Sequence, residues 1–117
     1  MSIAYAIVAV VAALMLFFSA SLKFRHVQQT IDVIHTQVGV PLSWFPLLGA
    51  CEVAGGLGLL VGIGVAPIGV AAGVGLVLYF VGAVIGHLRV GDTKGLSAPM
   101  PVLVLSLAAL VLRLLSL

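Results

Sequence analysis

The chain has 117 residues, of which 63% are hydrophobic and only eight carry a charge, five Lys or Arg and three Asp or Glu. This length fits one domain. A soluble domain carries roughly 25% charged residues, so the composition excludes a water-exposed globular protein. The net charge of +2 comes from too few groups to indicate a nucleic-acid partner. Lipid is therefore the expected environment of most of the chain.

Four apolar runs are long enough to cross a bilayer, which takes roughly 20 residues in a helix. We expect an all-α fold, a bundle of four transmembrane helices in a single membrane domain that covers residues 1–117. The expected spans are about 3–22, 45–63, 67–88 and 99–117.

Polar residues and prolines mark the ends of these spans. The first span ends at Lys23, and because no basic stretch precedes it we expect it to be retained rather than cleaved as a signal peptide. Pro46 and Pro67 fit the first turns of the second and third helices. The fourth begins near Pro99 or Pro101. An uncharged turn at 64–67 makes a helical hairpin of the second and third spans.

The surface segment, residues 24–43, is the longest polar stretch between the spans. Within it Phe24, Val27, Ile31, Ile34 and Val38 recur at spacings of three and four, which predicts a short amphipathic helix on the membrane surface. Near the span ends, Tyr5 and Trp44 are expected to be interface anchors.

Basic residues favour one orientation. Lys23, Arg25, Arg89 and Lys94 all follow the first or third span, which places them on one side of the membrane. The positive-inside rule then predicts that residues 23–44 and 89–98 are cytoplasmic and both termini outside. We expect a multi-pass protein of the bacterial cytoplasmic membrane.

Glycines at spacings of four predict close helix contacts, because small residues let membrane helices approach each other. The three pairs are Gly58 with Gly62, Gly69 with Gly73, and Gly82 with Gly86.

Glu52 is the most informative residue, because it lies about 9 Å along the second helix from Pro46 and an ionisable group at that depth indicates a functional site by default. The topology brings the ends of all four spans together on its side of the membrane. A buried polar cluster or ligand pocket is therefore expected there, with Asp92 and Ser97 above it and room beside the carboxylate at Gly49 and Gly56. Its candidate residues are Ser19, Lys23, Glu52, His87 and Arg89.

Three interpretations of this cluster remain open. Glu52 can pair with a neighbouring cation and fix helix register. Alternatively, Glu52 and His87 line a pocket for an apolar molecule with a polar head, such as a quinone or a lipid. In the third, Glu52 and His87 are a catalytic acid–base pair. No Cys, His and carboxylate spacing indicates a metal site, so no metal is expected.

Three stretches together resemble the DoxX-like membrane proteins: FSASLKF at 18–24, GACEVAGGL at 49–57 and GAVIGHLRVGD at 82–92. The resemblance implies a four-helix membrane bundle whose motifs mark Lys23, Glu52, His87 and Arg89. It also implies a small protein that serves another: a subunit of a quinone-linked sulfur oxidoreductase, a scaffold for redox partners or an assembly factor.

Two classes of function follow. The preferred one is an accessory, assembly or scaffold subunit that contacts lipid and a larger membrane or redox partner, or further copies of itself. The alternative is a protein that binds a quinone or lipid-like molecule through Glu52 and His87. An enzyme is a less favoured form of this alternative. Such an enzyme would be a quinone-linked oxidoreductase subunit or an acid–base enzyme on an apolar substrate.

Overall fold

The computed structural model describes residues 3–37, 39–91, 93–97 and 99–116, and most of these lie in four long α-helices. Three of the helices are long and apolar enough to cross a membrane, and the fourth is a shorter apolar helix. The predicted all-α, four-helix fold of a multi-pass membrane protein is therefore confirmed. The helices are α1 (Ile3–Phe24), α3 (Phe45–Val61), α4 (Ala66–Arg89) and α5 (Pro99–Leu115).

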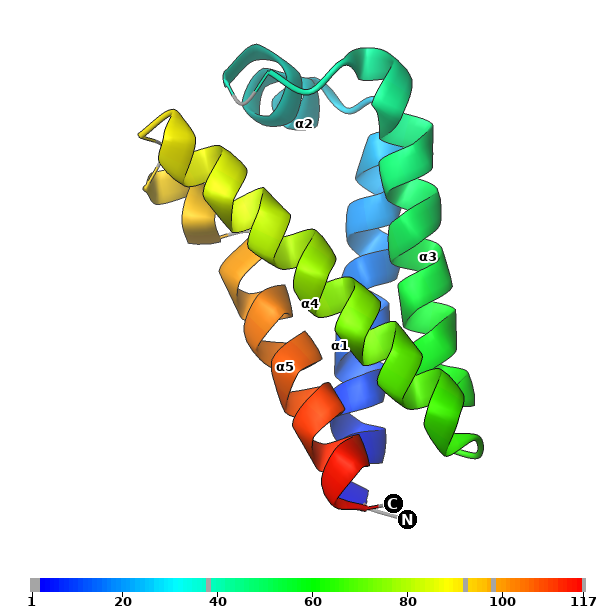
Figure 1. Cartoon of the computed structure of the whole chain (residues 1–117). Coiled ribbons are helices and arrows are strands. Elements are labelled where there is room, and N and C mark those ends of the chain that lie inside the picture. Colours follow the sequence, from blue (N-terminus) through cyan, green and yellow to red (C-terminus); the bar gives the residue numbers. More distant parts are fainter. Residues whose placement is uncertain (1–2, 38, 92, 98, 117) are drawn as a thin grey trace.

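Each long helix packs mainly against two others, so the four form a closed ring: α1 lies against α3 and α5, and α4 lies against the same two helices. Both chain ends lie at one end of the bundle, and the short helix α2 (Gln28–Thr30) lies across the other (Figure 1). In the same view α4 and α5 lean away from α1 and α3 toward the end that carries α2.

Buried positions on α1 recur every three or four residues, as an inward helix face requires. Tyr5, Ala9, Ala12 and Leu16 have no exposed surface. Large apolar side chains on the opposite faces are widely exposed, including Leu14 and Leu78 of α4. This inversion of a soluble surface means that the outer faces contact lipid.

The termini end of the bundle, called the closed end below, is held by glycine contacts between α3 and α4. A Cβ added to Gly62 would collide with the Gly69 backbone and the Tyr5 hydroxyl. One added to Gly58 would meet Ala72 of α4. Because these backbones touch directly, the hairpin is tightest beside its turn.

Gly73 and Gly82, two other glycines predicted to pack against a helix, have different surroundings. A Cβ on Gly73 would lie 3.0 Å from Leu110 of α5, whereas one on Gly82 would meet nothing within 4 Å. Gly82 therefore lies on an open wall rather than at a helix contact. Its i+4 neighbour Gly86 lines the same space.

The closed end also buries a cation and a phenol, and both bind the carbonyl end of α3. The Tyr5 hydroxyl donates to the Leu59 carbonyl at 2.7 Å, and Arg113 Nε donates to the Gly62 carbonyl at 2.9 Å. The Arg113 guanidinium lies 5.5 Å from the centre of the Tyr5 ring. The last carbonyls of a helix lack intrahelical partners and carry partial negative charge, so these side chains cap α3.

The prediction that Tyr5 is an interface anchor is therefore wrong. Its side chain has no exposed surface, because its hydroxyl finds a carbonyl partner inside the bundle. Trp44, at the start of α3, is half exposed, as an anchor would be.

At the other end, called the open end, the surface segment forms α2 and a π-helical turn, η1 (Ile31–Gln37). Gln28 and Asp32 on its exposed side hydrogen-bond to each other at 2.8 Å. Left-handed backbone brackets the segment, with φ of 49° at His26 and 90° at Gly39. Two single 3-10 turns complete the chain, η2 (Leu42–Trp44) and η3 (Lys94–Ser97).

Candidate functional site

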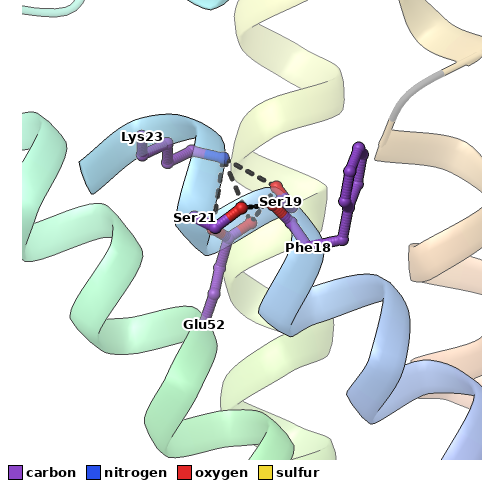
Figure 2. Close-up of polar contacts among 5 residues, drawn as sticks. All are labelled: Phe18, Ser19, Ser21, Lys23 and Glu52. Carbon is purple, nitrogen blue, oxygen red and sulfur yellow. Dashed lines mark hydrogen bonds and ion pairs between the residues drawn. The ribbon is translucent and has the colours of Figure 1, made fainter. Parts of the chain in front are cut away.

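Three polar side chains meet between α1 and α3 at the open end, and together they form the polar cluster: Ser19, Lys23 and Glu52. Lys23 Nζ donates to Glu52 Oε1 at 3.2 Å and to Ser19 Oγ at 2.9 Å, while Ser19 Oγ donates to Oε1 at 2.9 Å. Lys23 Nζ also lies 3.1 Å from Oε2. Figure 2 shows the three groups converging, with Phe18 directed away from them.

Helix geometry explains the meeting. Ser19 and Lys23 are four residues apart on α1, so their side chains lie on the same face one turn apart. Lys23 also lies in the last turn of α1, where the helix dipole favours a cation. Glu52 has no exposed surface and Lys23 is 8% exposed. A buried charge needs a partner of opposite charge, and Lys23 and Glu52 are each other's partner.

The two glycines that flank Glu52 on α3 do not provide the predicted room beside the carboxylate. A Cβ on Gly49 would lie 2.9 Å from the ring of Phe24, and one on Gly56 would lie 2.7 Å from the ring of Phe17. Both rings come from α1 and fill the hollows that the glycines leave. The glycines therefore bring α1 and α3 together at Glu52.

The space lies instead on the α4 and α5 side of the cluster, as a cavity of about 850 Å³. This volume is within the usual range for small-molecule and cofactor sites, roughly 300–1,000 Å³. All four long helices and the surface segment line it. The lining residues are Met15, Phe18, Ser19, Leu22, Lys23, Val27, Thr30, Ile34, Val40, Trp44, Leu48, Glu52, Tyr79, Phe80, Gly82, Ala83, Gly86, His87, Arg89, Pro99 and Val102.

The five candidate residues all line this cavity, but they do not form one hydrogen-bonded group. The contacts of Glu52 are with Lys23 and Ser19, so the ion pair is that of Glu52 with Lys23. His87 is buried on the α4 wall, and Arg89 is exposed at the end of that helix. Asp92, expected above them, lies outside the described residues.

The cluster leaves one acceptor available. Among the described residues, Glu52 Oε2 accepts no hydrogen bond although it is fully buried. Its contact with Lys23 Nζ is an ion pair without hydrogen-bond alignment. A buried acceptor without an aligned donor is costly, so this oxygen is the unsatisfied atom of the polar cluster.

Residues of the surface segment are part of the site, although the sequence pattern assigned them to the membrane surface. Val27, Thr30 and Ile34 line the cavity from α2, η1 and the turn before them. Thr30 was not among the residues predicted for the apolar face of the segment, but Val27 and Ile34 belong to that face. That face covers the cavity, while the polar face with Gln28, Asp32 and His35 is exposed.

Comparison with known proteins agrees with this architecture. The model of the DoxX-like family matches residues 7–110. No curated protein and no solved structure matches the chain. Because the family match covers most of the 117 residues, the chain belongs to the DoxX-like family.

Proposed function

We propose that this small DoxX-like membrane protein binds an amphipathic small molecule, such as a quinone or a lipid, inside the bundle. The observation that carries the proposal is the cavity of about 850 Å³ beside a buried ion pair whose Glu52 Oε2 accepts no hydrogen bond within the described part of the chain. Few polar groups in an otherwise apolar pocket are typical of ligand sites. The head group of the ligand lies at the open end, where the polar cluster and Arg89 both line the cavity.

Apolar side chains of the cavity are available to contact the apolar part of the ligand. Met15, Phe80 and Val102 line the cavity from α1, α4 and α5. Burial of apolar surface contributes roughly 25 cal/mol per Å², but lipid offers a competing apolar environment. Selectivity over bulk lipid therefore rests on the cluster and on cavity shape. A catalytic role would use Glu52 of α3 and His87 of α4, which both line the cavity, and requires the ligand to lie between them.

Two leucine substitutions on α4 test this proposal. Gly82→Leu enters the cavity and Gly75→Leu enters the lipid-facing side, and neither Cβ would meet an atom within 4 Å. Native mass spectrometry of each variant, extracted gently from its own membrane, records the bound molecules. We expect Gly82→Leu to lose a molecule that wild type and Gly75→Leu retain. Equal retention in all three would contradict the proposal.

An accessory role, favoured by the sequence alone, is the second candidate. The observation in its favour is an apolar groove of about 490 Å³ between α3 and α4 on the outer side of the bundle. Small residues make up much of it, including Gly55, Gly58 and Gly75, and Cys51 is at its edge. Grooves of this kind let a second membrane helix approach closely.

The same two variants separate the candidates, because the groove contains Gly75 and the cavity contains Gly82. A membrane protein that co-purifies in mild detergent with wild type and with Gly82→Leu, but not with Gly75→Leu, supports the accessory role. A small molecule that stays bound to wild type and to Gly75→Leu, but not to Gly82→Leu, supports ligand binding in the cavity. Homo-oligomers would appear in the same spectra as multiples of the protomer mass.

We propose that the open end faces the cytoplasm. Arg25 and Arg89 both lie there, and both termini lie at the opposite end (Figure 1). Because Cys51 is the one cysteine of the chain, Cys51→Ala followed by single cysteines at Ser2 or Thr93 allows labelling with an impermeant maleimide. Labelling at Ser2 in intact cells, and at Thr93 only after lysis, is expected.

A further inference from the structure

The described residues that line the cavity include two cations, Lys23 and Arg89, and one carboxylate, Glu52. Lys23 and Glu52 compensate each other at 3.1 Å. Arg89 also lines the cavity. In the described part of the chain, no acidic side chain pairs with its guanidinium. Among the described residues that line the cavity, Arg89 is therefore a cation without an acidic partner.

The position of Arg89 suits a head group that enters from the polar end of the cavity. It is the last residue of α4, and it is exposed. His87, two residues earlier on the same helix, is buried and lines the cavity too. The apolar lining from Phe18, Phe80 and Val102 lies on the cavity wall as well. One space thus combines an apolar wall with a cation at its exposed end.

We infer that the bound molecule is an anionic amphiphile, a carboxylate or phosphate on a long apolar chain, and that Arg89 selects it. This inference rests on the proposed function and narrows its ligand class. A guanidinium binds carboxylate and phosphate oxygens in a bidentate manner. A hydroxyl elsewhere on the same head group donates toward Glu52 Oε2, which has no hydrogen-bond donor among the described residues.

The contacts of the cluster explain why Arg89 rather than Lys23 selects the anion. The ammonium of Lys23 already donates to Ser19 and to Glu52. A second anion at Lys23 would also face the Glu52 carboxylate, and like charges at close range repel. The uncompensated cation at the mouth carries no such penalty.

The experiment compares two probes that differ only in the head group, palmitate and hexadecanol, bound to purified protein in uncharged detergent. We expect wild type to prefer palmitate by roughly tenfold or more, the ratio that a charge-assisted contact of about 1.4 kcal/mol gives. Arg89→Gln should reduce this preference to near unity. Arg25→Gln, an equal change of charge at an exposed residue that does not line the cavity, should leave it unchanged.

Each remaining outcome decides something. If both probes bind equally well and Gly82→Leu blocks both, the cavity binds a ligand but its selection for anions is overturned. If Arg25→Gln and Arg89→Gln weaken palmitate equally, the effect is general attraction and the role of Arg89 is overturned. If neither probe binds wild type, the inference of an anionic amphiphile is overturned, whereas the proposed function stands or falls on the loss of the bound molecule in Gly82→Leu.

Replacing palmitate by hexadecyl phosphate and by dipalmitoyl phosphatidate separates the two sources of an anionic head. A free acid is the ligand if the single-chain probes bind and phosphatidate does not. A membrane lipid is the ligand if phosphatidate binds at least as well. In both cases Arg89→Gln should weaken binding by the same factor.

Discussion

Each end of the bundle buries one cationic side chain, and the two cations have different kinds of hydrogen-bond partner. At the closed end Arg113 donates to a backbone carbonyl, to Ser116 and toward the face of Tyr5. At the open end Lys23 pairs with a carboxylate and a hydroxyl. Direct backbone contact fills the closed end, whereas the open end surrounds a cavity.

This difference indicates a division of work. Backbone carbonyls cannot move without unwinding α3, so the contacts of Arg113 fix three helices to one another. Side-chain partners can rotate, so the contacts of Lys23 can rearrange when a molecule arrives. A rigid end beside an adaptable end agrees with the proposed ligand binding, because preorganisation at one end limits the entropy lost on binding.

The largest expected effect comes from breaking the ion pair. Lys23→Met leaves Glu52 without a cation, and removing one partner of a buried pair typically costs about 3–5 kcal/mol. We expect a large fall in the thermal unfolding midpoint in detergent. The double variant Lys23→Met, Glu52→Gln should recover much of the loss; no recovery would mean that the pair contributes little beyond its packing.

Gly62→Ala should be the next most damaging, because its methyl group must fit where the Gly69 backbone and the Tyr5 hydroxyl already touch. Overpacking of this kind costs about 1–3 kcal/mol. Gly75→Ala is the matched control, since its Cβ would meet nothing within 4 Å. Unfolding in a denaturing detergent titration measures both. Equal stability of the two variants would show that the closed end is looser than described.

Arg113→Met should cost less than Lys23→Met, about 1–2 kcal/mol, because it leaves a carbonyl rather than a carboxylate without its partner. It should not alter ligand binding, since Arg113 does not line the cavity. Thermal unfolding and native mass spectrometry test the two statements separately. Loss of ligand without loss of stability would contradict the separation of the two ends.

The smallest effects come from two serines, the part-buried Ser19 and the fully buried Ser106, and should have opposite signs. Ser19 donates to Glu52 at 2.9 Å, so Ser19→Ala should destabilise by about 1 kcal/mol. Ser106 is fully buried, and its Oγ has no hydrogen-bond partner among the described residues. Ser106→Ala should therefore be neutral or stabilising. A shift of the same sign in both variants would argue that Ser106 has a partner such as a buried water.

Much of the fold was predictable because the bilayer imposes a length on each helix and the polar breaks are sharp. Topology alone brings Lys23 and Glu52 to one end, and the structure has them 3.1 Å apart. Arg113 and Tyr5 were not recognised as partners, because their link runs through carbonyls of α3 that no side-chain pattern reveals.

The cavity was less predictable than the residues around it. Glycines beside Glu52 suggested space, yet Phe17 and Phe24 occupy it. The real space arises because α4 and α5 lean away from α1 and α3 toward the open end (Figure 1). Helix tilt depends on packing contacts along the whole bundle, and the spacing of apolar residues does not contain that information.

The shortness of α5 has a consequence for the surrounding membrane. Its 17 residues span about 26 Å, whereas the 24 residues of α4 span about 36 Å. A bilayer core is roughly 30 Å thick, so we expect hydrophobic mismatch to be larger beside α5 than beside α4. Pro99, the first residue of α5, lines the cavity. The lipids beside the short helix therefore also lie next to the cavity, and if the cavity binds the proposed ligand, we expect bilayer thickness to influence that binding.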